Sequence, residues 1–362
     1  MMLSASRRHV PDVAMRILIV GGGVQYGVPK SYFRSFKEIG EDVFFFDDER
    51  FFWRGWKLFD RILNNHFSHK IFWRFFSRKA ERGLFNYVKK ERPDLLFVFK
   101  GVLFSGGFPR VLKRECPNLI LFYFSPDDLL NPLNTNRHMK RGIKEYDCVF
   151  TPRKFALDEI LAMGVKRAEY LPFAFDPLIS HPIDVSKEDR RRFGSDVVFV
   201  GTYEKERLVI LEGLGVYDLA IWGNAWNKIS RFSPIRKSVR FQEVVGDGIL
   251  KVFGSSKVVL GFLRKKNRDT HTMRTFEIPA SGAFMLHERT DEALSFFEEG
   301  KEADYFSTLE ELKEKINFYL KNDEKRKNVA IAGHKRAISS GYSYFDRAKR
   351  VLKVYNEIKQ KS

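Results

Sequence analysis

The residues best suited to chemistry lie in one stretch of the second half of the chain, Leu263–Glu288 (LRKKNRDTHTMRTFEIPASGAFMLHE). A basic cluster that begins at Arg264 follows a predicted strand, and Arg274 and Thr275 precede a short predicted helix that carries Glu277. Cations at a strand end beside the start of a helix neutralise anionic groups such as phosphates. We therefore expect an anion site here, with a solvated charged loop as the alternative.

Three carboxylates are candidates for the reaction itself. Asp127 and Asp128 follow a predicted strand, and Asp269 stands eight positions before Glu277. In open parallel sheets, ligands bind beyond the carboxyl ends of the strands. Carboxylates placed there can accept a proton from a hydroxyl group or bind a sugar hydroxyl, although aspartates also cap turns. Lys100 follows another strand end, where a lysine either meets a phosphate or stays in water.

Glycine turns follow three of the predicted strands. Gly22 and Gly23 come after the first one, where backbone N–H groups can approach a phosphate or a sugar. The dinucleotide-binding fingerprint G-x-G-x-x-G is incomplete, so a plain tight turn is the alternative. Gly201 and the Trp222-Gly223 pair end two later strands and allow close turns there.

Two cations follow the Gly201 turn. Lys205 and Arg207 either reach phosphates across a cleft between domains or begin a solvated helix. Neither an H-x-x-x-H nor a C-x-x-C pair is present, so we predict no metal site.

Strands and helices alternate along the chain, and these elements must position the residues above. Short apolar strands are predicted at Arg16–Val20, Val43–Phe46, Leu95–Phe99, Leu119–Phe124, Cys148–Phe150, Val197–Val200, Leu219–Trp222, Val258–Phe262, Ala283–Leu286 and Asp304–Phe306. Amphipathic helical patterns lie between them, which is typical of parallel sheets with helices on both faces. The sequence predicts an α/β fold with two tandem Rossmann-like domains and a helical C-terminus.

A proline-containing stretch interrupts this alternation and suggests the domain boundaries. We predict a disordered extension at 1–14, a first domain at 15–172, a linker at 173–189, a second domain at 190–340 and a C-terminal helix at 341–362.

Composition narrows the class of protein. The 362 residues include 64 Lys and Arg against 46 Asp and Glu, and the formal net charge of +18 favours an anionic partner. Two cysteines cannot form a disulfide framework, which suggests a reducing, cytoplasmic setting. No uncharged apolar run approaches the roughly 18 residues of a membrane span.

Much of the positive charge is local to residues 50–92. This segment carries twelve basic and three acidic residues, a net of +9, and is rich in Trp and Phe. It is predicted to be a helical insertion. Its aromatic residues either form the core of that insertion or contact an anionic membrane surface or a polyanionic acceptor.

With these motifs in place, the second domain resembles the C-terminal domain of GT-B glycosyltransferases. Within them it is similar to the glycosyl transferase group 1 proteins related to the spore-maturation CgeB proteins. The resemblance rests on the stretches VFVGTYEKER, IWGNAW, RTFEIPASGAFML, SFFEEGKEADYFSTLEELKEKINFYL and AGHKR, and more loosely on PDLLFVFKG, SPDD, YDCVFTP and YLPFAFDP in the first domain. It extends roughly from Arg16 to Lys353.

The resemblance implies roles for the candidate residues. Glu277 falls on the second glutamate of the E-x7-E signature, which implies contacts to the donor ribose, and Asp269 falls on the first position, which implies the donor sugar. Arg207, Lys205 and Arg274 correspond to diphosphate-binding cations. Thr275, Gly201, Trp222 and Gly223 belong to the matching donor-site motifs. Asp127 or Asp128 takes the place of the catalytic histidine, which has no match here.

The expected function is therefore a metal-independent, retaining glycosyltransferase of hexosyl type, with a cytoplasmic location and peripheral contact with the inner face of the membrane. The donor would be a UDP- or GDP-linked sugar, and the acceptor a hydroxyl of a glycan, a lipid-linked molecule or a protein. No cofactor beyond this co-substrate and no nucleic-acid partner are expected. Two alternatives stay open: a nucleotide-sugar binder without turnover, and a basic nucleic-acid-binding protein.

Overall fold

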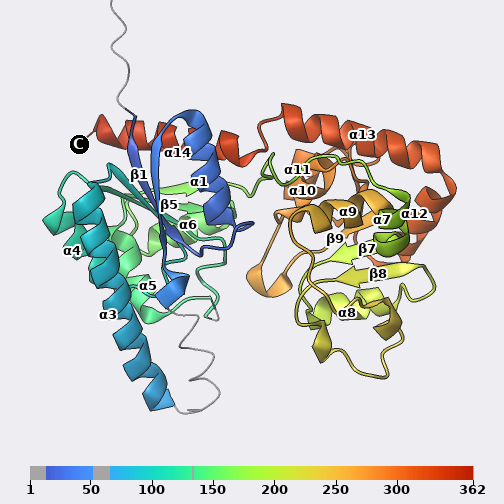
Figure 1. Cartoon of the computed structure of the whole chain (residues 1–362), viewed down its shortest axis with the longest axis horizontal. Coiled ribbons are helices and arrows are strands. Elements are labelled where there is room, and N and C mark those ends of the chain that lie inside the picture. Colours follow the sequence, from blue (N-terminus) through green and yellow to red (C-terminus); the bar gives the residue numbers. More distant parts are fainter. Residues whose placement is uncertain (1–13, 52–65, 133, 362) are drawn as a thin grey trace, which may run out of the picture.

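Two α/β domains, each built on a parallel sheet, lie side by side in the computed structural model, which describes residues 14–51, 66–132 and 134–361 (Figure 1). The strands of the first sheet are β1 (Arg16–Gly21), β2 (Asp42–Asp47), β3 (Leu95–Phe99), β4 (Ile120–Phe124), β5 (Cys148–Thr151) and β6 (Ala168–Tyr170). They pair in the order β2-β1-β3-β4-β5-β6. The second sheet contains β7 (Ser195–Val200), β8 (Leu219–Trp222), β9 (Ser256–Gly261), β10 (Met285–Glu288) and β11 (Asp304–Phe306), in the order β11-β10-β9-β7-β8.

Helices cover both faces of the first sheet, which explains why its strands are continuous apolar runs. One face packs against α1 (Val28–Ile39) and α14 (Tyr344–Lys359). The opposite face packs against α3 (His66–Glu91), α4 (Phe108–Glu115), α5 (Arg137–Gly142) and α6 (Ala156–Ala162). The core of this domain is strongly aromatic: Phe97, Phe122 and Phe150 are fully buried and contact one another.

The second sheet is also covered on both faces. One face carries α8 (Lys205–Glu212), α12 (Leu309–Lys321) and α13 (Asp323–Ser339). The other carries α9 (Asp247–Ser255), α10 (Arg274–Ala280) and α11 (Asp291–Phe296), with α7 (Lys187–Phe193) packed on α9. Short 3-10 helices lie at Glu49–Phe51, Ile143–Glu145, Trp226–Lys228, Arg236–Ser238 and Lys265–Asn267. The predicted fold class, two parallel sheets with a helical C-terminus, is confirmed.

The C-terminal helix α14 returns to the first domain and packs along α1 (Figure 1). Tyr344, Val351, Val354 and Tyr355 are buried in a core that continues through both domains. At the start of α14, Ser343 pairs with Phe175 as a parallel bridge. The chain therefore crosses between the domains twice, once near Phe175 and once near Ser343.

The helical insertion predicted at 50–92 is corrected in part by the structure. Residues 52–65, like residues 1–13 of the predicted disordered extension, lie outside the described part of the chain. Helix α3, however, is the regular crossover between β2 and β3: Ala80, Leu84 and Val88 recur every four residues and are buried against the sheet. None of the described helices is long and apolar enough to span a bilayer.

Candidate active site

Two adjoining cavities lie where the carboxyl ends of both sheets meet, as expected for open parallel sheets. The larger, the interdomain cavity, has a volume of about 620 Å³ and is lined from both domains. The smaller, the Glu277 cavity, measures about 200 Å³. Val24, Val28 and Met273 line both cavities, so the two are neighbours. The two cavities therefore share one wall, formed by these three residues.

The interdomain cavity brings together charged groups from three strand ends. Asp127, after β4, forms ion pairs with Lys100 after β3 (2.8 Å) and with Arg264 after β9 (3.3 Å). Burial opposes ionisation of this carboxyl, but Lys100 and Arg264 outweigh it and hold the pKa of Asp127 below its usual value. Asp127 is therefore a fixed anion, well placed to orient neighbouring cations.

A second carboxylate of the cavity, Asp48, was not predicted from the sequence. It follows β2, lines the interdomain cavity and is only 5% exposed. Burial and the neighbouring Glu49 and Asp47 raise the pKa of Asp48 to about 7. A carboxyl with this pKa can both accept and release a proton near neutral pH. In the sequence, the signal for this carboxylate is the acidic run Asp47-Asp48-Glu49 directly after a predicted strand.

The glycine turn after β1 faces these carboxylates. A Cβ added to Gly22 would lie 2.6 Å from the Glu49 carboxylate, and the Gly23 N–H donates to Asp47 Oδ1 (3.2 Å). Such surroundings repel a phosphate and favour a ligand that donates hydroxyl hydrogens. Of the two ligands predicted for Gly22 and Gly23, a phosphate or a sugar, these surroundings favour the sugar; Gly22 lines the interdomain cavity and Gly23 does not.

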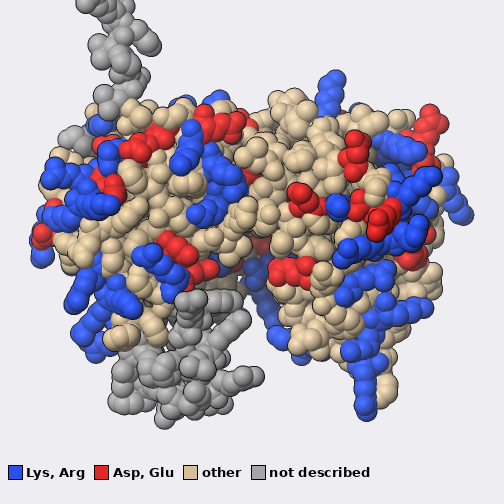
Figure 2. All heavy atoms as spheres, viewed as in Figure 1, with Lys and Arg blue, Asp and Glu red and all other residues tan. Residues whose placement is uncertain are grey.

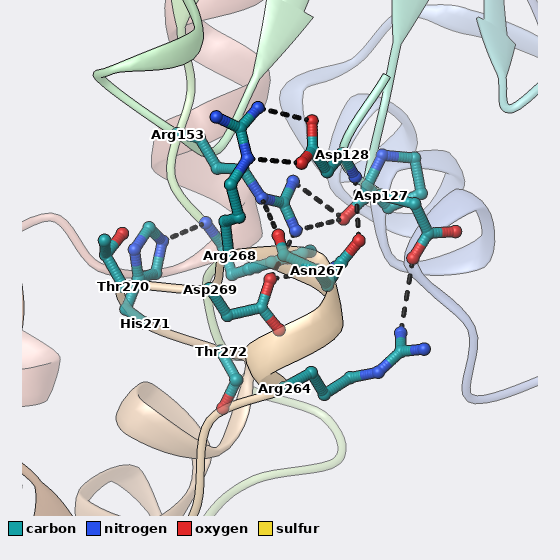
Figure 3. A network of polar contacts seen from close by, with 12 residues as sticks. Asp127, Asp128, Arg153, Arg264, Asn267, Arg268, Asp269, Thr270, His271 and Thr272 are labelled. Carbon is teal, nitrogen blue, oxygen red and sulfur yellow. Dashed lines mark hydrogen bonds and ion pairs between the residues drawn. The ribbon is translucent and has the colours of Figure 1, made fainter. Parts of the chain in front are cut away.

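The loop after β9 reaches across to the first domain (Figure 3). Asn267 Oδ1 accepts from the Asp128 amide (2.8 Å) and from Asn134 Nδ2 (2.8 Å). Arg268 binds both carboxylate oxygens of Asp128 (2.6 and 3.0 Å) and also pairs with Glu159. The Asp128 carboxylate is buried in this ion pair and does not line the interdomain cavity. The catalytic role predicted for Asp128 is therefore replaced by a structural one, in which it connects the two domains.

A buried ion pair completes this interface. Arg153, two residues after β5, pairs with Asp269 of the second domain; their side chains are 2% and 4% exposed. The Arg153 guanidinium also donates to the carbonyls of Pro126 (3.2 Å) and Asn267 (3.0 Å). Asp269 lines the interdomain cavity, but its Oδ1 is held by Arg153 and Asn267. Arg153 was missed because nothing in its sequence context shows that its partner lies in the other domain.

The Glu277 cavity holds the predicted donor-site pair. Glu277 and Arg274 form an ion pair one turn apart on α10, with side chains 18% and 26% exposed. Arg274 Nε also lies 3.4 Å from the carbonyl of Val200 at the end of β7. A cation and a carboxylate thus stand side by side in this cavity, both accessible to a ligand.

The structure places three other predicted residues away from both cavities. Thr275 is fully buried, and its hydroxyl contacts His287 Nε2 (3.0 Å), so it supports α10 from within. Arg207 is buried, donates to the Thr202 carbonyl (3.0 Å) and has a pKa that burial lowers. Lys205 is exposed at the first position of α8.

The remaining predicted residues shape the loops after β7 and β8. A Cβ on Gly223, whose φ is +132°, would collide with the Gly201 backbone. The Gly201 carbonyl also accepts from Trp226 Nε1 (2.9 Å), and Trp222 is buried. Gly201 and Gly223 are needed for close backbone packing, and neither lines the two cavities. In the described residues no group of three or more His, Cys, Asp or Glu is arranged to hold a metal ion.

Two Rossmann-like domains with a ligand-sized cavity between their strand ends and a C-terminal helix that returns to the first domain make this a GT-B fold. Residues 206–353 match the family described as Glycosyl transferase-like. That match covers most of the second domain and all of α10.

Solved structures share this fold over nearly all of the chain. A glycosyltransferase from Rickettsia africae superposes with a TM-score of 0.66 at 14% identity, covering 96% of this chain and 100% of that one. Sucrose-phosphate synthase from Thermosynechococcus elongatus gives 0.67 at 10% identity, with the same coverages. Anabaena HepE, in complex with UDP and glucose, gives 0.61 at 12% identity, covering 95% and 100%. No curated protein sequence matches this chain.

Proposed function

We propose that this protein is a glycosyltransferase that moves a hexosyl group from a nucleoside diphosphate sugar to a hydroxyl of an acceptor. The observation that carries the proposal is the pair of adjoining cavities in a GT-B fold, one with an accessible Arg274–Glu277 pair and one lined by carboxylates. Similarity of residues 206–353 to the Glycosyl transferase-like family supports it. The complexes of Anabaena HepE with UDP and with UDP-glucose make a uridine donor the first one to test.

In this proposal the donor nucleotide occupies the Glu277 cavity. Glu277 accepts hydrogen bonds from the ribose hydroxyls, and Arg274 lies beside the diphosphate. As the bond between the sugar and the diphosphate breaks, negative charge grows on the diphosphate, and a preorganised cation stabilises this charge. Removal of such a cation lowers the rate roughly a hundredfold. We propose that transfer needs no metal ion and retains the anomeric configuration, as the resemblance of the second domain implies.

The acceptor occupies the first-domain side of the interdomain cavity. Asp48 receives the proton of the attacking hydroxyl, because its pKa of about 7 makes it a far better base than Asp127. Asp127 keeps Lys100 and Arg264 in place. The acceptor is a glycan, a lipid-linked molecule or a protein hydroxyl.

A nucleotide-sugar binder without turnover is the second candidate. One observation favours it: Asp269, the expected sugar contact, is engaged with Arg153 in a buried pair. A binder of this kind would hold the donor without releasing nucleoside diphosphate.

Release of nucleoside diphosphate separates these two functions. Each nucleotide sugar is incubated with a panel of hydroxyl acceptors, and free UDP or GDP is measured. We expect release from one donor, reduced roughly a hundredfold by Arg274→Ala and unchanged by Arg114→Ala, an exposed arginine on α4. Donor binding without release across the acceptor panel would favour the binder.

A further inference from the structure

A third cavity, separate from the two described above, lies on the outer surface of the first domain. It has a volume of about 480 Å³ and is lined by Arg110, His138, Arg141 and Lys144 together with the Ser105-Gly106-Gly107 turn before α4. Nothing lies within 4 Å of a Cβ placed on Gly107, so the turn is open at this point. A small anionic group would meet cations from two sides here.

The helix beside this cavity carries a stripe of cations. Arg137, Lys140, Arg141 and Lys144 recur with the spacing i, i+3, i+4 and i+7 along α5 and the turn that follows, and all are exposed. Met139 and Ile143 face the core on the opposite side. In the described residues none of these four cations has an ion-pair partner, whereas Arg110 pairs with Glu145 (2.6 Å).

Helix α3 extends this cationic surface. Trp73 stacks on His138 with ring centroids 4.2 Å apart, which places α3 directly beside α5. Arg74, Arg78 and Arg82 follow on α3 at four-residue intervals, and all are exposed. Burial and the positive charges of Arg137 and Arg141 lower the pKa of His138, as expected in a strongly positive environment. Figure 2 shows Lys and Arg side chains gathered over this part of the first domain.

The nearby acidic residues are already engaged. Glu81 accepts from the Ser105 amide (2.5 Å), and Glu145 is held by Arg110. Phe75 stands among the cations of α3 and is 62% exposed. Among the described residues the cations of α3 and α5 on this face have no ion-pair partner, and an exposed aromatic ring beside such cations is typical of a surface that meets both lipid headgroups and the outer acyl region.

We propose that this basic face, formed by Arg74, Arg78, Arg82, Arg137, Lys140, Arg141 and Lys144, docks the protein on an anionic membrane surface, with a lipid phosphate in the cavity beside Arg141 and Lys144. This inference goes beyond the proposed function and does not depend on it. The loop Lys100–Gly107 lines the interdomain cavity at one end and this cavity at the other. Docking would therefore place the acceptor side of the interdomain cavity near the lipid surface.

Vesicle cosedimentation of the full-length protein tests the proposal. Phosphatidylcholine vesicles are compared with vesicles that also contain phosphatidylglycerol, at low and high salt. We expect binding only to the anionic vesicles, weakened by salt. Arg141→Gln combined with Lys144→Gln should weaken it roughly 30-fold, which corresponds to about 2 kcal/mol for two cations.

A matched control variant tests whether vesicle binding depends on this basic face or only on the net charge of the protein. Lys187→Gln combined with Arg191→Gln removes two exposed cations from α7 of the second domain and should leave vesicle binding within about twofold of wild type. Unchanged melting temperature and nucleotide binding in both variants would show that the fold and the donor site are intact.

Four results would overturn the proposal. They are binding to neither kind of vesicle, equal binding to both kinds, equal loss in the two double variants, and binding of glycerol phosphate or single-stranded RNA without binding of anionic vesicles. The last result would assign the face to a soluble phosphate compound or to nucleic acid.

Discussion

In the candidate site, the neighbours of each side chain determine whether that side chain can contact a ligand. Asp127 and Asp128 are adjacent in sequence, yet one lines the interdomain cavity and the other is held by Arg268. Asp127 and Lys100 were both predicted at strand ends, and the structure pairs them because parallel strands bring their carboxyl ends to one edge. The inward direction of Thr275 and the partner of Asp128 depend on contacts from elsewhere in the chain, which spacing alone does not reveal.

The pKa of Asp48 predicts two opposite effects of pH. Activity should rise as pH increases through about 7, because the base must be ionised, and Asp48→Asn should abolish that rise. Stability should fall between about pH 4 and pH 7, because the unfolded chain releases the proton first. The difference between the pKa of Asp48 and its usual value near 4 corresponds to a loss of about 4 kcal/mol in the free energy of unfolding above pH 7.

Melting curves at pH 5 and pH 8 test the stability effect. Asp48→Asn should be more stable than the wild type at pH 8, and this difference in stability should be smaller at pH 5. Asp184→Asn, at an exposed position, should leave the melting temperature unchanged at both pH values. A variant no more stable than wild type at pH 8 would show that Asp48 is not a buried, proton-retaining carboxyl.

Among the elements, short apolar runs predicted most of the strands, and an amphipathic pattern predicted the C-terminal helix. The strands Leu95–Phe99 and Asp304–Phe306 have the predicted bounds, since buried parallel strands are short apolar runs between polar turns. Helix α3 was harder to interpret, because its exposed face is basic and aromatic while Ala80, Leu84 and Val88 form a narrow buried stripe. The destination of α14 could not be predicted, because an amphipathic helix does not show which surface it covers.

Helix α14 should contribute strongly to the first domain. Val351 is fully buried where α14 meets the core, so Val351→Ala should cost about 2 kcal/mol in unfolding free energy. Lys353→Ala, at an exposed position on the same helix, should cost less than about 0.5 kcal/mol. Urea unfolding measures both, and equal costs would contradict packing of α14 on the first domain.

At the scale of the whole molecule, the two domains share one core and a polar interface. Both are needed for the interdomain cavity, since Asp127 and Lys100 come from the first domain and Arg264 and Asp269 from the second. The sequence predicted two domains facing a cleft. It did not show that Arg153 and Asp269 would join them, because this pair connects positions 116 residues apart.

Removal of Arg153 should loosen this interface. Arg153→Ala leaves Asp269 buried without its partner and should cost about 3–5 kcal/mol, whereas Arg153→Ala combined with Asp269→Ala should recover part of the loss. Arg114→Ala, at an exposed ion pair, should cost no more than about 1 kcal/mol. Calorimetry that found less than 1 kcal/mol for Arg153→Ala would rule out a structural role for the pair.

We propose that a nucleoside diphosphate sugar binds beside Glu277, and thermal stabilisation by UDP, GDP and their sugars tests this binding. A ligand at about 100 times its dissociation constant adds about 2.7 kcal/mol. We predict that one nucleotide stabilises the wild type and the exposed control Glu310→Ala, but not Glu277→Ala, whose native carboxylate pairs with the largely buried Arg274. Equal stabilisation of Glu277→Ala, or no stabilisation of the wild type by any nucleotide, would contradict the claim.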